Sequence, residues 1–244
     1  MMAPPLRAIL WDFDGTLVDT RARNMSVNRR IVREITGRSW QDFPVLRSQS
    51  VYDAAQRAAV NWREFYRTNC GFSDDQIDGA GDRWAPYQAE DPTPVPLVEG
   101  VAKTLDGFDG LPEGIVSQNA RETIESVLSS HGLGRRFDCI VGYAEVPMSR
   151  QKPAPDSLLL GLEELTALAP GRALYIGDHA TDLCCVDNAN RELEARGLEL
   201  RVVSIAALWG PGLVDHGWAA GADLSAATPL DVVEIVRHLL KARG

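Results

Sequence analysis

The chain has 244 residues, 45% of them hydrophobic and 24% charged, which is enough to bury a sizeable core in one domain or in one domain with an insert. Its formal charge of −9 argues against a nucleic-acid-binding protein, because a phosphate backbone requires a basic face. No apolar run approaches the roughly 18 residues of a membrane span, and no targeting pattern is visible. We therefore expect a cytoplasmic protein that binds neither nucleic acid nor membranes.

Short apolar runs rich in Ile, Val or Leu alternate with amphipathic stretches along most of the chain. The apolar runs predict buried strands at residues 7–13, 114–117, 139–142, 173–177 and 201–205. The amphipathic stretches predict helices at residues 98–108, 121–131, 155–168, 181–196 and 231–242. Alternating strands and helices imply right-handed crossovers, so we expect an α/β fold with a doubly wound parallel sheet. Its functional crevice should lie at the carboxyl ends of the strands.

One interval, from about residue 21 to residue 89, departs from this alternation because its patterns are all helical. It ends in "DPTPVP", residues 91–96, whose prolines suit a linker. We therefore expect a Rossmann-like core formed by residues 1–19 and 96–244, with a small α-helical domain inserted at residues 20–95.

The first predicted strand ends in "DFDGT", which contains Asp12 and Asp14. Alone, this stretch could be an ordinary Asp-Gly turn. A calcium-binding loop is excluded, because the glycine directly follows the second aspartate and a strand precedes the loop in place of a helix.

Three further polar motifs lie at or just after the ends of later strands or before a helix. They are "VSQNA" with Ser117 and Asn119, "KPAPD" beginning at Lys152, and "IGDHATD" with Asp178 and Asp182. Because the carboxyl ends of parallel strands meet at one edge of a sheet, we expect these side chains to cluster.

The four motifs, in this order and with a helical segment after the first, resemble the haloacid dehalogenase superfamily of aspartyl-phosphate hydrolases. Within it, the chain is most similar to the phosphoglycolate-phosphatase-like branch, and the similarity extends to the late "ALWGPG" and "GAD". The resemblance implies a Rossmann-like core with a helical cap. It also implies a Mg²⁺-dependent phosphatase that hydrolyses a small phosphomonoester through an aspartyl-phosphate intermediate.

The resemblance assigns roles to the four aspartates. Asp12 would be the nucleophile, and Asp14 would protonate the leaving oxygen and then activate water. Crowded carboxylates facing a phosphate require a cation, and hard oxygen ligands favour Mg²⁺. Its expected ligands are the Asp12 side chain, the Asp14 backbone carbonyl and the Asp178 side chain. Asp182 would hold a metal-bound water or Lys152.

The remaining expected site residues neutralise or bind the phosphoryl group. Ser117 and the backbone amides near Gln118 and Asn119 would hold phosphate oxygens, and Thr16 would brace the loop. Lys152 would supply a positive charge to both the phosphoryl group and the nucleophile. Taken singly, Ser117 could merely cap a helix and Lys152 could lie on the surface.

Specificity is expected from the helical cap, where Arg47 in "FPVLRSQSVYDA" would meet an anionic or polar part of the substrate or would simply be a solvated side chain. The only lysines are Lys103, Lys152 and Lys241, so the cap lacks the Schiff-base lysine that a phosphonoacetaldehyde hydrolase needs. Asp14 disfavours the dehalogenase branch, which lacks this second aspartate. A phosphosugar mutase and a catalytically dormant binding or regulatory protein stay open as alternatives. The substrate and the oligomeric state do not follow from the sequence.

Overall fold

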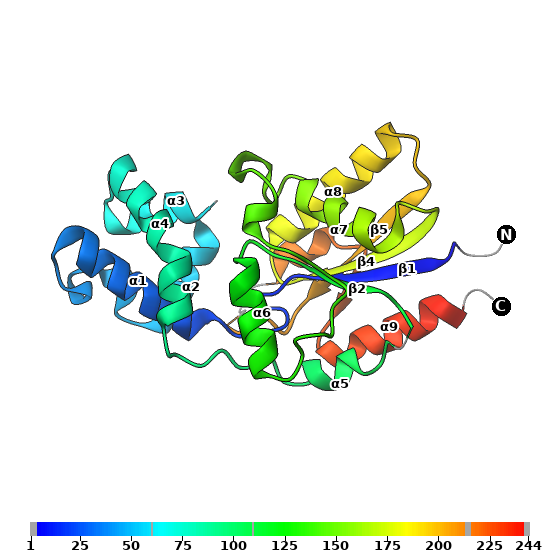
Figure 1. Ribbon diagram of the computed structural model, residues 1–244, viewed down its shortest axis with the longest axis horizontal. Coiled ribbons are helices and arrows are strands. Elements are labelled where there is room, and N and C mark those ends of the chain that lie inside the picture. Colours follow the sequence, from blue (N-terminus) through cyan, green and yellow to red (C-terminus); the bar gives the residue numbers. More distant parts are fainter. Residues whose placement is uncertain (1–3, 60, 109, 213–215, 242–244) are drawn as a thin grey trace. The chain divides into compact units, whose positions relative to one another are not determined.

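The computed structural model describes residues 4–59, 61–108, 110–212 and 216–241. The chain forms two compact units, which we call the core unit, Met1–Asp19 with Leu97–Gly244, and the helical unit, Thr20–Pro96 (Figure 1). The proline-rich segment at residues 91–96 forms the last part of the helical unit.

The core unit is built on a parallel sheet whose order, within the described residues, is β3-β2-β1-β4-β5-β6. The strands are β1 (Leu6–Trp11), β2 (Glu113–Val116), β3 (Cys139–Val141), β4 (Gly171–Gly177), β5 (Leu200–Ala207) and β6 (Leu224–Ala226). β1 lies between β2 and β4 and is buried along almost its whole length, as expected for a central parallel strand. The predicted fold class, a doubly wound parallel sheet with an inserted helical unit, is confirmed.

Helices cover both faces of this sheet (Figure 1). On one face α7 (Asp156–Thr166) and α8 (Ala180–Ala195) bury an apolar stripe against the strands, in a cluster that includes Leu10, Leu158 and Val186. On the other face lie α5 (Val101–Leu105), α6 (Arg121–Ser130) and α9 (Pro229–Lys241).

The described elements differ from the sequence predictions mainly at their ends. Strand β6 was not predicted, because its three residues are too few to show an apolar pattern and its pairing depends on β5. Helix α5 begins later than predicted because it follows Gly100, whose φ of 90° lies outside the helical region, and it ends at Leu105, before the predicted residue 108. The predicted last helix includes Ala242, which lies outside the described residues.

The helical unit consists of α1 (Arg21–Thr36), α2 (Gln49–Ala58), α3 (Trp62–Phe65) and α4 (Asp74–Glu90), with short turns at Trp40–Asp42, Pro44–Leu46 and Tyr66–Cys70. Its buried core contains Ile31, Leu46, Tyr52 and Phe65, so it has an apolar interior of its own. α4 begins with a capping box in which Ser73 and Gln76 exchange hydrogen bonds.

The chain leaves and re-enters the core unit at adjacent points. Val18 and Leu97 form an isolated antiparallel bridge, and the Val98 amide donates to the carbonyl of Leu17 at 3.0 Å.

In the described part of the chain, no helix combines the length and the apolar character required to span a membrane.

Candidate active site

The predicted site residues of the core unit gather at the carboxyl edge of the sheet. Trp11, the last residue of β1, pairs with Ile115 of β2 and Ile176 of β4, so these three strands end at nearly the same level. Asp12 therefore lies beside Asp178 and Ser117, each of which follows the end of a neighbouring strand. The Asp12 amide donates to the carbonyl of Ile176 at 2.8 Å, which fixes the backbone where the first motif begins.

A buried ammonium group lies at the centre of this site. The Nζ of Lys152 donates to Oδ1 of Asp12 at 2.7 Å and to Oδ1 of Asp182 at 2.8 Å. All three side chains are almost excluded from water. Charges in such surroundings are retained only when they are paired, so these residues form one electrostatic unit.

The titration of this unit reflects burial and crowding. Burial raises the pKa of the Asp12 carboxyl to about 7, Lys152 opposes this shift, and Asp182 and Asp14 add to it. Burial also disfavours the charged form of Lys152, but Asp12 and Asp182 outweigh it and hold the pKa of the ammonium above its usual value. Lys152 is therefore a permanent cation, while Asp12 needs additional positive charge to be fully ionised near neutral pH.

Asp14, which is half-buried, is oriented by residues that follow β2. Nδ2 of Asn119 lies 3.2 Å from each of its carboxylate oxygens, and Oγ of Ser117 lies 3.5 Å from Oδ2. The Asn119 amide donates to Oγ of Ser117 at 3.1 Å, so this backbone donor is engaged within the loop. In the first of the two carboxylates of "DFDGT", Asp12, an oxygen thus accepts from a cation, whereas Asn119 and Ser117 offer neutral donors to the second, Asp14.

The turn after these aspartates is tightly fitted. Gly15 has a φ of 82°, and a Cβ at this position would overlap the carboxylate of Asp178. Thr16 is fully buried, and its hydroxyl has no hydrogen-bond partner in the described residues. The Thr16 carbonyl accepts a bond of 2.9 Å from Nε1 of Trp209, which follows β5. The glycine and the tryptophan together hold the loop against its neighbours.

Three carboxylates in this site have the chemistry of a divalent-cation site. Oxygens of Asp12, Asp178 and Asp182 lie within 4.8 Å of one another, and oxygen-rich sets of this kind suit Mg²⁺. Both oxygens of Asp182 accept hydrogen bonds, Oδ1 from Lys152 and Oδ2 from the His179 amide, whereas Lys152 engages Oδ1 of Asp12. Asp12 and the half-buried Asp178 are therefore the members best placed to bind a cation. The residues therefore fit the predicted Mg²⁺.

Two of the predicted residues donate to backbone carbonyls through their side chains. Gln118 is exposed, and its Nε2 donates to the backbone carbonyl of Lys152 at 3.1 Å, so its side chain secures the lysine segment. Arg47 belongs to the helical unit, where it is exposed and its Nε donates to the carbonyl of Gln41 at 2.6 Å. Its role toward a substrate stays a prediction.

Tyr175 and Trp209 were not assigned a role from the sequence, although both touch site residues. Tyr175 is a buried residue of β4 in the stretch "LYIGD". Most buried phenols form a hydrogen bond, which is the signal that could have drawn attention to it. Trp209 gives no comparable local signal, because its partner is nearly two hundred residues away along the chain.

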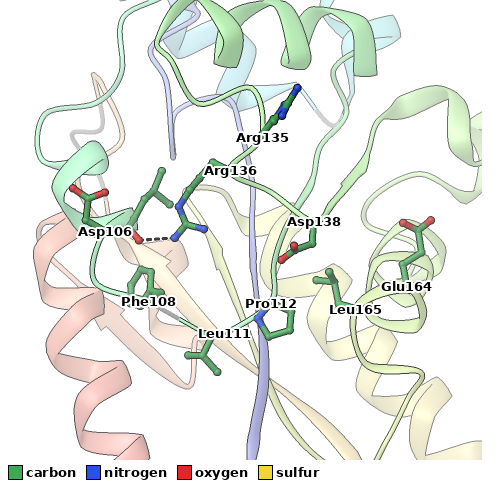
Figure 2. Close-up of a pocket in the computed structure, with 11 residues that line it drawn as sticks. Asp106, Phe108, Leu111, Pro112, Arg135, Arg136, Asp138, Glu164 and Leu165 are labelled. Atoms are coloured by element: carbon green, nitrogen blue, oxygen red, sulfur yellow. Dashed lines mark hydrogen bonds between the residues drawn. The ribbon is translucent and has the colours of Figure 1, made fainter.

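A cavity of about 730 Å³ lies at the opposite, amino edge of the sheet, where Pro112 and Asp138 precede β2 and β3 (Figure 2). Arg136 projects into it and donates to the carbonyl of Leu105 and to the buried carboxylate of Glu113. The cavity is separated from Asp12 by the length of the strands, so it does not belong to the carboxylate site.

The chain belongs to the haloacid dehalogenase-like hydrolases. The model of that family matches residues 9–195, from within β1 to the end of α8, and this span contains all four motifs. The predicted family and the predicted class of enzyme, a hydrolase, are thereby confirmed.

Similar proteins place the chain within this family. N-acetylmuramic acid 6-phosphate phosphatase of Pseudomonas aeruginosa is 27% identical over 186 residues, which cover 73% of this chain and 76% of that enzyme. Phosphoglycolate phosphatase of Escherichia coli is 26% identical over 202 residues, with the same coverage of both chains. The crystal structure of a phosphoglycolate phosphatase candidate from Lactobacillus plantarum shares the fold, with a TM-score of 0.74 and 23% identity over 96% of this chain and 100% of that one. The predicted phosphoglycolate-phosphatase-like branch is confirmed.

Proposed function

We propose that the protein is a Mg²⁺-dependent phosphatase that hydrolyses a small phosphomonoester through an aspartyl-phosphate intermediate. The observation that carries this proposal is the buried ammonium of Lys152, which bonds to Asp12 beside the carboxylate of Asp178. A carboxylate can attack an anionic phosphate only where fixed positive charge offsets the repulsion.

In the first step, an oxygen of Asp12 forms a bond to phosphorus while the bond to the leaving oxygen breaks. Lys152 holds the attacking carboxylate in place and offsets negative charge that gathers on the phosphoryl oxygens. A Mg²⁺ bound by Asp12 and Asp178 would supply further positive charge to the same group.

Asp14 acts as the general acid and then as the general base. It gives its proton to the leaving oxygen, and it later takes a proton from the water that attacks the aspartyl-phosphate. Asn119 and Ser117 hold its carboxylate in position.

The names of two relatives support a substrate class. N-acetylmuramic acid 6-phosphate and phosphoglycolate, which give two of the similar enzymes their names, are phosphomonoesters that also carry a carboxylate. We therefore propose a small metabolite with both groups as the substrate, and Arg47 of the helical unit as a residue that binds its second anionic group.

A phosphate-release screen tests this function. We expect Mg²⁺-dependent release from phosphoglycolate or N-acetylmuramic acid 6-phosphate that exceeds release from neutral sugar phosphates and nucleoside monophosphates. The control is Asp12→Asn, in which release should vanish. Conversion of one sugar phosphate into another, primed by a bisphosphate and faster than phosphate release, would identify a mutase. Wild-type release no higher than that of Asp12→Asn on every ester would indicate a dormant protein.

A further inference from the structure

Tyr175 contacts two of the buried groups of the site, Asp182 and Lys152. It lies on β4, is 1% exposed, and its hydroxyl oxygen is 3.0 Å from the carbonyl of Val116 and 3.2 Å from Oδ1 of Asp182. Val116 is the residue immediately before Ser117. One phenol thus touches the end of β2 and the carboxylate that binds Lys152.

The same side chain also contacts Lys152. Nζ of Lys152 lies 5.0 Å from the centroid of the Tyr175 ring, within the range of a cation–π interaction. Oδ1 of Asp182 is the oxygen that accepts from Lys152, so the tyrosine hydroxyl and the ammonium share one acceptor. Displacement of Tyr175 would therefore affect the ammonium through both its ring and its hydroxyl.

The hydroxyl has one proton and two neighbouring acceptors. A carboxylate accepts a stronger hydrogen bond than a peptide carbonyl does, so donation to Asp182 is favoured. The second oxygen of Asp182, Oδ2, accepts from the His179 amide at 3.2 Å. With both oxygens held, the Asp182 carboxylate cannot rotate freely, and its position defines where the ammonium lies.

We infer that Tyr175 is a positioning residue that, through Asp182 and through its ring, holds the ammonium of Lys152 against Asp12. The effect of Tyr175 on catalysis rests on the proposed function. Its effect on the position of Lys152 rests on the geometry alone. Without the hydroxyl, Asp182 has one donor fewer, attracts the ammonium more strongly and draws it away from Asp12. The ammonium of Lys152 then stabilises the transition state less, whereas the groups that bind the rest of the substrate are unaffected.

The test variant is Tyr175→Phe, which retains the ring and removes only the hydroxyl. A matched control is Tyr66→Phe in the helical unit, because Tyr66 is equally buried and its hydroxyl has no hydrogen-bond partner among the residues that the structure describes. Far-ultraviolet circular dichroism and thermal unfolding establish that both variants are folded.

The first readout does not depend on turnover. The chain has only three lysines, so protein labelled with ¹³C and ¹⁵N in lysine gives three side-chain NMR signals. These are assigned with Lys103→Arg and Lys241→Arg. In Tyr175→Phe the Lys152 signal should shift or broaden while the other two stay in place, and in Tyr66→Phe all three should stay. An unmoved Lys152 signal in Tyr175→Phe would overturn the inference and assign the hydroxyl to Val116 alone.

The second readout is steady-state hydrolysis of p-nitrophenyl phosphate with Mg²⁺. Tyr175→Phe should lower kcat about fivefold to tenfold, as expected for the loss of one hydrogen bond, with KM changed less than about twofold. A shifted Lys152 signal with unchanged kcat would refute the positioning role. If the wild type releases no phosphate from any monoester, the proposed function fails, and the NMR comparison still decides whether Tyr175 holds Lys152.

Discussion

Nζ of Lys152 lies 2.7 Å from Oδ1 of Asp12, although the two residues are 140 positions apart in the chain and both are buried. The contact joins the segment before α7 to the end of β1, so the charge balance of the site depends on the tertiary fold.

The first prediction concerns this cation. Lys152→Met leaves Asp12 and Asp182 buried without their shared partner, so we expect a loss of about 3 kcal/mol in the free energy of unfolding at pH 7.5. Phosphate release should fall by at least about a hundredfold. Urea unfolding and a phosphate assay measure the two effects. Lys103→Met, which removes an exposed lysine, is the control, and equal stability of the two variants would contradict the prediction.

The second prediction separates catalysis from stability at Asp12. Asp12→Asn removes one of several crowded carboxylates while Asp182 still pairs with Lys152, so the variant should unfold at a temperature no lower than the wild type does. Phosphate release should nevertheless be abolished, because an amide cannot form the aspartyl-phosphate. Substantial remaining turnover would disprove the nucleophile assignment.

The third prediction concerns the cation ligands. Asp178→Asn should raise the Mg²⁺ concentration required for half-maximal activity by at least about tenfold, because a charged oxygen ligand is replaced by a neutral one. The measurement is a Mg²⁺ titration of phosphate release. Asp187→Asn, an exposed change on α8, should leave the titration as in the wild type. Identical titrations for Asp178→Asn and the wild type would exclude Asp178 as a ligand.

The fourth prediction uses two glycines with the same kind of backbone. Gly15 and Gly37 have φ values of 82° and 70°, so alanine at either position should cost about 1 kcal/mol of unfolding free energy. Only at Gly15 would the added methyl group overlap the Asp178 carboxylate, whereas nothing lies within 4 Å at Gly37. Gly15→Ala should therefore lose both stability and activity, and Gly37→Ala stability alone. Full activity in Gly15→Ala would show that the loop tolerates displacement.

The fifth prediction is a pH dependence of stability that arises at the amino edge. Burial raises the pKa of Glu113 from an ordinary 4.5 to about 7, against the opposing effects of Arg136 and of the hydrogen bond from Trp11. The folded state thus binds the proton more tightly than the unfolded state does. The stabilising contribution is fully present below pH 4.5 and is lost as the pH rises through 7.

Glu113→Gln cannot titrate, so its unfolding free energy should lack this decline, which amounts to at most about 3 kcal/mol. Urea unfolding between pH 5 and pH 8 measures the difference. Glu163→Gln, which changes an exposed carboxylate on α7, should follow the wild-type slope. Parallel curves for wild type and Glu113→Gln would contradict the prediction.

The sequence predicted those features that depend on a short, continuous stretch of residues. Asp12 and Asp14 follow an unmistakable apolar strand, and the spacing between Asp178 and Asp182 places both near the start of a helix. The sheet class and the helical insert were predicted for the same reason, because apolar runs and amphipathic stretches are local properties.

The remaining features depend on partners that are distant in the sequence. Tyr175 could equally have been an ordinary core aromatic, since its relation to Asp182 and Val116 requires the folded sheet. Strand β6 forms by pairing with the edge of β5. The carboxylate of Glu113 accepts hydrogen bonds from Arg136 and Trp11, both distant in the sequence. No pattern within a few residues encodes such relations.

The bridge between Val18 and Leu97 has a consequence for how this chain can vary. Val18 and Leu97 belong to the core unit, and their bridge holds the two ends of the inserted segment together. The entropy lost when these ends are brought together is therefore offset by contacts within the core unit and not by contacts of the insert. An insert attached in this way can be lengthened, shortened or exchanged while the register of β1 against β2 and β4 is maintained. The fold thus allows the helical unit to change in length and sequence without disturbing the strands that carry Asp12 and its neighbours.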